Sequence, residues 1–329
     1  MKPQTKFTVS ALALGLAFTA QAISANPAKA DLDLPCNAVS MIVPWGAGGD
    51  TDIIFRQVVD TANRLGASPE LRVVNIGGQG GNRGAAEALA ADPDGCTLLA
   101  LHDSAITSYL TERVDFNWDA FDTVSLLTYT PSVIGAALDT PFDDMQGLLE
   151  AARANPGGIS AGSTIGSTSH FIFLVIEDAA EVSFNHIPFE GTRERLTGVL
   201  SGTVDLGEMN IITANQYIAD GELKALGIAL PERDPTAPDI PTLAEQGLDI
   251  EYGLSRGVVA PPGTDPEIIA YFDDLFARAM ADEGMSAALE GAGTSVRYMD
   301  AAGYADFMER NFDTHERIAI AIGMYTPDN

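Results

Sequence analysis

The stretch that decides the fold is SMIVPWGAGGDTDIIFRQVVDTANRL, residues 40–65. Its first four residues form a short apolar run that is typical of a buried strand. A glycine-rich turn at residues 44–49 follows, and the acidic residues at 50 and 52 then begin an amphipathic helix that continues to about Leu65. A strand, a short turn and a helix in this order predict a parallel sheet with right-handed crossovers.

The same order recurs further along the chain. We predict strands near residues 71–75, 97–101, 159–161, 186–188, 204–206 and 225–228, and helices near 85–91, from about 171, and from 193 to 200. Hydrophobic residues make up 46% of the 329 residues, which is enough for a packed interior. The length is large for a single core and favours two α/β domains.

The N-terminus predicts export. Two lysines precede an uncharged apolar run at residues 7–22, and Ala28-Lys29-Ala30 is a small-x-small cleavage signature. The run is shorter than the roughly 20 residues that a spanning helix needs, so a signal peptide over residues 1–30 is favoured over a membrane anchor. We therefore expect a mature periplasmic protein that begins near Asp31 and inserts into no membrane.

The charge balance excludes several partners. The chain carries a formal charge of −28, and removal of residues 1–30 would leave 15 basic against 46 acidic residues. Such a surface repels nucleic acid and anionic lipid. It also repels an anionic ligand at long range, so a carboxylate site must depend on local donors.

The two cysteines predict a disulfide. Cys36 and Cys96 each stand just before a predicted strand, the first and the third. In a doubly wound sheet of order 2-1-3 these two strands are neighbours, and both cysteines lie at the same end. Export permits the bond, and no histidine or further cysteine accompanies the pair as a metal site would require.

Glycine-rich and hydroxyl-rich turns are the strongest functional signal. The turns at residues 44–49, 77–81 and 162–169 each offer backbone N–H groups at the start of a helix, where an anion is favoured by about 0.3–1 kcal/mol. Two such turns that face each other across a cleft would bind a carboxylate specifically. For the serines and threonines of residues 162–169, helix capping and ligand contact remain equal alternatives.

Signals for catalysis or cofactor binding are few. The motif at residues 78–84 imitates a dinucleotide loop, but Arg83 stands where its third glycine is required. His102, His170, His186 and His315 show no metal-ligand spacing. A hydrolase that pairs Ser167 or Ser169 with His170 is a weak alternative, because neighbours on one turn rarely give the geometry of a nucleophile and its base. No cofactor is expected.

An ordered set of motifs resembles one known family. VPWGAGGDTD at residues 43–52, VNIGGQGGNRG at 74–84 and DPDGCTL at 92–98 are similar to motifs of the periplasmic solute-binding proteins of tripartite tricarboxylate transporters. Shorter matches continue in order at residues 155–157, 166–170, 187–191, 202–205 and 241–245. The resemblance implies a type II periplasmic-binding-protein fold, with two α/β domains and a ligand cleft between them. It also implies a partner, an integral membrane permease driven by an ion gradient.

The resemblance further implies a ligand set and a domain division. Domain one would comprise residues 31–132 and 257–329, domain two residues 133–256, and the hinge strands would lie near 133–138 and 252–258. A di- or tricarboxylate would be held by the two loops and their surroundings, with Arg256 as a second carboxylate anchor and a surface arginine as the alternative. Asp52 is either a contact for a ligand amine or a helix cap. The expected ligand residues are Pro44, Trp45, Gly46, Ala47, Gly48, Gly49, Asp52, Ser104, Gly162, Ser163, Thr164, Gly166, Ser167, Thr168, His170, Phe189, Gly191, Asp205 and Arg256.

We expect a monomer that binds its ligand reversibly without chemistry. A receptor that signals instead of transporting is the main alternative at this stage, because the same sequence pattern fits both.

Overall fold

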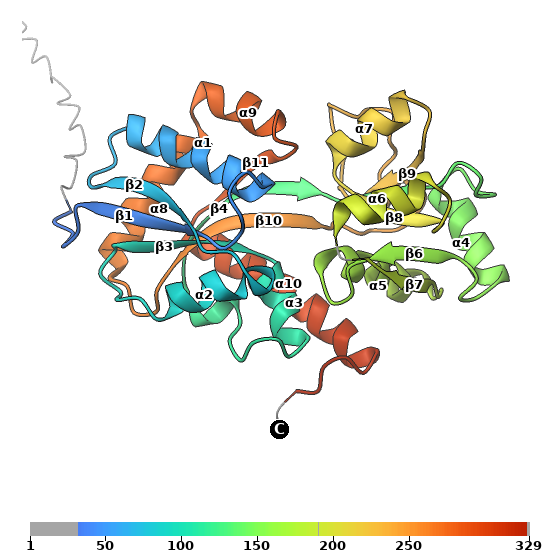
Figure 1. Ribbon diagram of the computed structural model, residues 1–329, viewed down its shortest axis with the longest axis horizontal. Helices are drawn as coiled ribbons and strands as arrows, with labels where there is room; N and C mark the ends of the chain where they lie inside the picture. The colour runs from blue at the N-terminus through green and yellow to red at the C-terminus, as the bar shows by residue number, and fades with distance from the viewer. Residues whose placement is uncertain (1–31, 190, 328–329) are drawn as a thin grey trace, which may run out of the picture. The chain divides into compact units, whose positions relative to one another are not determined.

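Two β-sheets organise the chain in the computed structural model, which describes residues 32–189 and 191–327 (Figure 1). The predicted signal peptide, residues 1–30, lies outside the described residues. No helix in the described part of the chain is both long enough and apolar enough to span a membrane.

The first sheet has six strands in the order β11-β4-β10-β3-β1-β2. They are β1 (Ala38–Val43), β2 (Glu70–Asn75), β3 (Thr97–His102), β4 (Asp122–Pro131), β10 (Gly253–Ala260) and β11 (Ser295–Met299). The strand β1 pairs in parallel with β2 and β3, as the sequence predicts. The strand β10 runs antiparallel between β3 and β4.

The second sheet has five strands in the order β7-β6-β8-β5-β9. They are β5 (Val133–Ala136), β6 (Ser160–Ser163), β7 (Asn185–Pro188), β8 (Leu206–Met209) and β9 (Lys224–Ile228). The strand β6 is parallel to β7 and β8, and β5 is antiparallel to β8 and β9.

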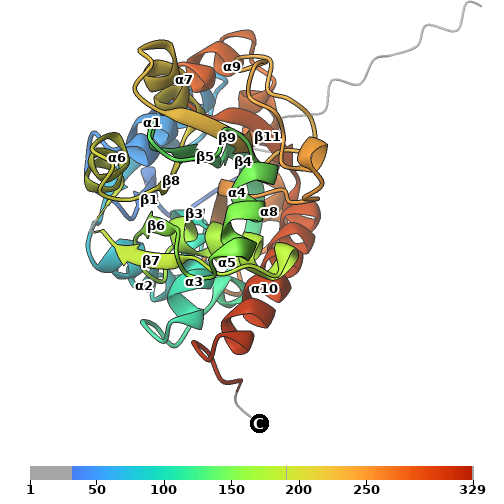
Figure 2. The same cartoon turned by 90° about the vertical axis from the view of Figure 1, so that its right-hand side faces the viewer.

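Helices cover the faces of both sheets. They are α1 (Asp50–Arg64), α2 (Asn82–Leu89), α3 (Ser104–Leu110), α4 (Met145–Ala154), α5 (Thr168–Ala180), α6 (Thr192–Leu200), α7 (Ile211–Ala219), α8 (Pro266–Met280), α9 (Glu283–Glu290) and α10 (Ala301–Ala321), with short 3-10 turns η1 (Gln79–Gly81), η2 (Trp118–Ala120) and η3 (Ala244–Gln246). The helix α1 follows its predicted amphipathic pattern, because Ile54, Phe55, Val58 and Val59 are buried. The helix α10 packs against β4 and reaches α5 (Figure 2).

The chain passes between the sheets through a short, well-paired segment. Ser132 alone separates β4 of the first sheet from β5 of the second. Its N–H donates to the carbonyl of Tyr252 (3.0 Å), and its own carbonyl accepts from Ala229 (2.9 Å). Tyr252 in turn donates to the carbonyl of Ala229 (3.1 Å), so the strands that cross between the sheets are hydrogen-bonded to each other there.

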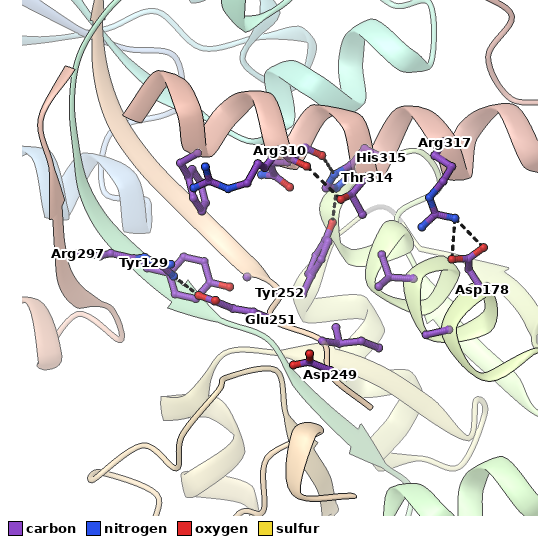
Figure 3. A pocket seen from close by; sticks show the side chains of 16 residues that line it. Tyr129, Asp178, Asp249, Glu251, Tyr252, Arg297, Arg310, Thr314, His315 and Arg317 are labelled. Atoms are coloured by element: carbon purple, nitrogen blue, oxygen red, sulfur yellow. Dashed lines mark hydrogen bonds and ion pairs between the residues drawn. The ribbon is translucent and has the colours of Figure 1, made fainter. Parts of the chain in front are cut away.

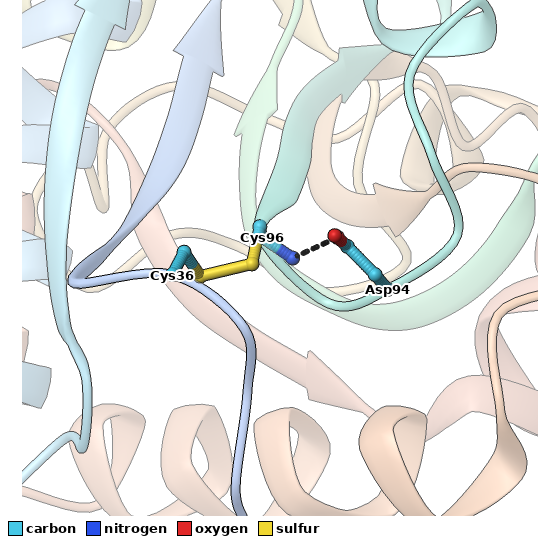
Figure 4. The surroundings of a disulfide bond; sticks show 3 residues. All are labelled: Cys36, Asp94 and Cys96. Atoms are coloured by element: carbon cyan, nitrogen blue, oxygen red, sulfur yellow. Dashed lines mark hydrogen bonds between the residues drawn. A yellow bond between two sulfur atoms is a disulfide. The ribbon is translucent and has the colours of Figure 1, made fainter.

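The predicted disulfide is present (Figure 4). Cys36 precedes β1 and Cys96 precedes β3, and the Cα atoms of the two residues are 5.9 Å apart. The N–H of Cys96 donates to the carboxylate of Asp94 (2.9 Å), which holds the turn that leads into β3. The prediction succeeded because the 2-1-3 order of parallel strands places both cysteines at one edge of the sheet.

Candidate functional site

The first predicted loop, residues 44–49, lies at the edge of the first sheet where β1, β2 and β3 end. Because these strands are parallel, their carboxyl ends meet at one edge, the usual place for a ligand site in such a sheet. Asn75, the last residue of β2, donates from its side chain to the carbonyl of Trp45 (3.1 Å) and to the carboxylate of Asp52 (2.8 Å). Ser104 begins α3 directly after β3 and so stands at the same edge.

Asp52 holds the loop in shape. Its side chain is 2% exposed, and its carboxylate accepts hydrogen bonds from the N–H of Gly48 (2.8 Å) and from Arg56 (3.0 Å). Burial by itself raises the pKa of Asp52, but the hydrogen bonds from Arg56, Gly48 and Asn75 outweigh it and lower the pKa below the ordinary 3.8. With these partners the carboxylate fixes the turn that precedes α1, and Gly49, which lacks a side chain, is the N-cap residue.

Trp45 and His102 form an aromatic pair beside this loop. Their rings stack with centroids 3.5 Å apart, and a side chain at Gly81 would collide with the indole. The Nε2 atom of His102 lies 2.8 Å from the hydroxyl of Thr51. Burial, and second the positive charge of Arg256, hold the pKa of His102 well below 6.5, so the ring is neutral at pH 7.

Arg256 is a buried cation near the Trp45–His102 pair, because Thr51 contacts both His102 and Arg256. Its side chain comes from β10, is 4% exposed, and donates to the hydroxyls of Thr51 (3.2 Å) and Thr130 (2.7 Å). It makes no ion pair with any carboxylate among residues 32–189 and 191–327. Burial lowers the pKa of Arg256 to about 10, and the more distant charges of Asp50 and Asp103 only partly offset it.

The second predicted loop follows β6 and leads into α5. Ser163 is fully buried, and its hydroxyl has no hydrogen-bond partner in the described chain. The N–H of Gly166 donates to Nδ1 of His170 (3.2 Å), while the N–H of Thr164 donates to the hydroxyl of Ser169 (3.2 Å). Ser167, the N-cap residue of α5, donates to the carbonyl of Thr164 (2.7 Å) and does not cap the helix with its side chain.

His170 therefore shapes the second loop. Burial, and second the neighbouring His186, lower the pKa of His170 to about 4, so the ring is neutral at pH 7 and can accept the Gly166 N–H. The serine hydroxyls at 167 and 169 bond to each other (2.9 Å). This arrangement lacks the bond between a serine and a histidine base that the hydrolase alternative requires.

Most of the remaining predicted residues surround the second loop. Thr168 is the first residue of α5, and Gly191 is the N-cap residue of α6. The N–H of Phe189 donates to the carbonyl of Ser163 (2.9 Å), and its ring lies where a side chain at Gly162 would be. Asp205 is not part of this group, because its carboxylate accepts from the N–H and hydroxyl of Ser160 (both 2.7 Å), at the opposite end of β6.

Polar residues that the sequence reasoning missed connect the second loop to the crossing at Ser132. Arg195 of α6 is 3% exposed, pairs with Glu208 (2.8 Å) and donates to Ser169 (3.3 Å). The hydroxyl of Ser132 at the crossing donates to the other oxygen of Glu208 (3.2 Å). Ser132 is two residues from Thr130, the partner of Arg256, a spacing that puts both side chains on one face of an extended strand.

A direct contact also joins the first sheet to the second loop. The guanidinium of Arg113, just after α3, donates to the carbonyl of Ile165 (2.9 Å). A side chain at Gly166 would lie 2.9 Å from Thr111 and 3.0 Å from Arg113, so this close approach requires glycine. Sequence signals for these residues were absent, because their roles depend on which elements pack together.

The described residues contain no group of three histidine, cysteine, aspartate or glutamate side chains that could hold a metal ion. The site can offer hydroxyls, backbone N–H groups, aromatic surface and two buried guanidinium groups, of which that of Arg256 has no carboxylate partner in the described residues. These groups are suited to hold an anion.

Comparisons with known proteins concern the family and the fold. A sequence model of the tripartite tricarboxylate transporter family receptors matches residues 54–324. A protein of Cupriavidus necator, named for its position in the gbd 5' region, is 29% identical over 329 residues, which is 98% of each chain. A TctC solute-binding protein from Polaromonas has a TM-score of 0.78 at 26% identity, with 87% of this chain and 99% of that chain covered. MatC from Rhodopseudomonas palustris, solved with bound malate, has a TM-score of 0.70 at 27% identity, with 87% and 100% covered.

Proposed function

This chain belongs to the tripartite tricarboxylate transporter receptor family, and from that premise we propose that it is a periplasmic receptor which binds a small di- or tricarboxylate and delivers it to a membrane permease. The fold is the α/β periplasmic-binding-protein fold that the sequence predicted, with two sheets. Family and fold are those of solute-binding proteins, so the proposed cycle is binding and release without a chemical step.

Arg256 carries this proposal. A buried charge is expensive unless a partner of opposite sign neutralises it, and proteins normally supply that partner. Arg195 has one in Glu208, whereas the partners of Arg256 among the described residues are two hydroxyls. A ligand carboxylate would neutralise Arg256 and use the donors of its guanidinium that Thr51 and Thr130 leave free.

The second loop supplies the proposed second anchor. The unpartnered hydroxyl of Ser163 and the backbone N–H groups of the first residues of α5 would bind another carboxylate. Two anchors, one on each sheet, favour a ligand with two or three carboxylates over a monocarboxylate. The similar protein MatC was solved with malate, a dicarboxylate, which supports the same ligand class here.

We further propose that residues 31–132 with 257–329 and residues 133–256 move as two domains. Ligand contacts on both sheets would favour the closed form, and hinge strands near 133–138 and 252–258 would absorb the motion. The closed monomer would dock on the permease after export through the predicted signal peptide.

A thermal-shift screen of the mature protein tests the proposal. The panel contains succinate, malate, citrate, an aromatic dicarboxylate and acetate, each with wild type, Arg256→Ala and Arg278→Ala. Arg278 is an exposed arginine of α8 paired with Asp274 and serves as the matched control. A ligand at 100 times its Kd stabilises by about 2.7 kcal/mol, or about 5 °C for a protein of this size. We expect that shift from one di- or tricarboxylate in wild type and Arg278→Ala, and its loss in Arg256→Ala. The absence of a shift with every carboxylate would refute the receptor proposal, and a shift that survives Arg256→Ala would refute the role of Arg256.

A further inference from the structure

A second pocket lies on the opposite side of β10 from Arg256. Adjacent residues of a strand face opposite sides, and here Arg256 reaches Thr51 of α1 while Gly257 faces Tyr304 of α10. The hydroxyl of Tyr252 bonds to His315 of α10 (2.9 Å), so Tyr252 also faces the α10 side. The rear pocket, as we call it, has a volume of about 410 Å³ and is bounded by residues of β4, α5, β11, α10 and the segment that enters β10 (Figure 3).

The rear pocket has aromatic and apolar side chains on part of its wall, among polar and charged ones. Tyr129, Ile250 and Tyr252 are buried, and Phe307 and Val175 are partly buried beside them. His315 adds no charge at pH 7, because burial lowers its pKa to about 4. A ligand that entered would therefore place a flat or aliphatic body against these side chains.

The charged side chains around the rear pocket are three arginines and three acids. Arg297 contacts the carboxylate of Glu251 and lies over the ring of Tyr129, 4.6 Å from its centroid. Arg317 donates to both carboxylate oxygens of Asp178 (2.8 and 2.9 Å). These two arginines are thus neutralised by carboxylates of the protein itself.

One cation and one anion of the rear pocket are left without a partner in the described part of the chain. They are the guanidinium of Arg310, on α10, and the carboxylate of Asp249, in the segment before β10, and both residues are exposed to solvent at the pocket's rim. Figure 3 shows them on opposite sides of Tyr252. The pocket therefore presents opposite charges on the two sides of the Tyr252 ring.

We propose that the rear pocket is a second binding site, which takes a small zwitterion whose carboxylate and ammonium groups are separated by an apolar spacer. Arg310 holds the carboxylate, Asp249 holds the ammonium, and the spacer lies against Tyr252 and Phe307. This ligand differs in chemistry from the carboxylates proposed for the site of Arg256, so neither proposal depends on the other.

The probe for the test is 4-(aminomethyl)benzoate, with benzoate and benzylamine as the two half-ligands. About a dozen non-hydrogen atoms at the usual efficiency of a small ligand give a Kd on the order of 1 mM. Binding is measured by ligand-observed NMR on the mature protein up to about 10 mM probe. We expect the zwitterion to bind more tightly than either half-ligand.

Variants separate the two charges. Arg310→Ala should weaken the zwitterion and benzoate about fivefold and leave benzylamine unchanged, and Asp249→Ala should weaken the zwitterion and benzylamine and leave benzoate unchanged. Arg278→Ala is the matched control and should change nothing. Arg256→Met should keep the zwitterion bound, because that residue faces the other side of β10. The proposal is overturned if the zwitterion does not bind, if it binds no better than benzoate, if Arg310→Ala binds it like wild type, or if Arg256→Met abolishes its binding.

Discussion

Replacing each of two buried arginines by methionine should change the stability of the ligand-free protein very differently. Arg256 and Arg195 are 4% and 3% exposed, so their burial is matched. They differ in that Arg195 pairs with Glu208 at 2.8 Å, whereas within the part of the chain that the structure describes Arg256 bonds to the hydroxyls of Thr51 and Thr130 and to no carboxylate.

The magnitudes follow from these partners. Depression of the pKa of Arg256 from 12.5 to about 10, chiefly by burial, means that its positive charge costs the folded protein about 3 kcal/mol. Arg256→Met removes that cost and also two hydrogen bonds, each worth about 1–2 kcal/mol. The free energy of unfolding should therefore stay within about 1 kcal/mol of wild type. Arg195→Met leaves the carboxylate of Glu208 without its cation and should cost about 3–5 kcal/mol.

Urea unfolding at pH 7 without ligand, followed by circular dichroism, measures both changes. Equal m-values for the variants and wild type would show that the comparison concerns stability alone. The reasoning fails if Arg256→Met costs as much as Arg195→Met, because the positive charge would then be compensated within the protein and would need no ligand carboxylate.

Three further predictions concern acid stability, the second loop and the disulfide. Burial lowers the pKa of His315 from 6.5 to about 4, so about 3 kcal/mol of the free energy of unfolding is present above pH 6.5 and is lost as the pH falls towards 4. The urea midpoint of His315→Gln should therefore fall less steeply than that of wild type over this range. Parallel curves for the two proteins would contradict this. Gly166→Ala should weaken carboxylate binding in calorimetry and should lower stability more than Gly157→Ala. Both glycines have a φ of 72°, but only a side chain at 166 would meet Thr111 and Arg113. Equal effects of the two variants would show that backbone strain alone matters. Replacement of both Cys36 and Cys96 by serine should cost up to about 4 kcal/mol in urea unfolding, because the bond closes a loop over a sequence separation of 60 residues, and an unchanged midpoint would refute this.

The alternation of strands and helices could be predicted from the sequence because it rests on local patterns. The turn at residues 44–49 separates an apolar run from an amphipathic helix, and both elements appear with nearly the predicted bounds. The disulfide could be predicted for the same reason, since the order of parallel strands follows from the repeated unit. The family resemblance rested on an ordered set of such local motifs, and it is confirmed.

Side-chain roles were harder to predict where they depend on distant partners. Asp52 was expected to contact a ligand amine or cap a helix, but Arg56, Asn75 and the loop N–H of Gly48 occupy its carboxylate. Asp205 was expected in the ligand set, yet the structure places it at the far end of β6 with Ser160. In both cases the residue type was compatible with several roles, and packing selected one.

The sequence by itself determined the α/β class, the parallel strand and helix units that begin the first sheet, the disulfide and the two candidate loops, because each depends on residues that are close along the chain or on a repeated local pattern. Only the tertiary structure decided which of the two buried arginines has a carboxylate partner among the described residues, because Arg195 of α6 meets Glu208 of β8 while Arg256 meets Thr130, more than a hundred residues away along the chain. Only the tertiary structure assembled the rear pocket as well, from side chains that lie between residues 129 and 317. Burial and pairing decide the cost of a charge, and both are properties of the folded chain.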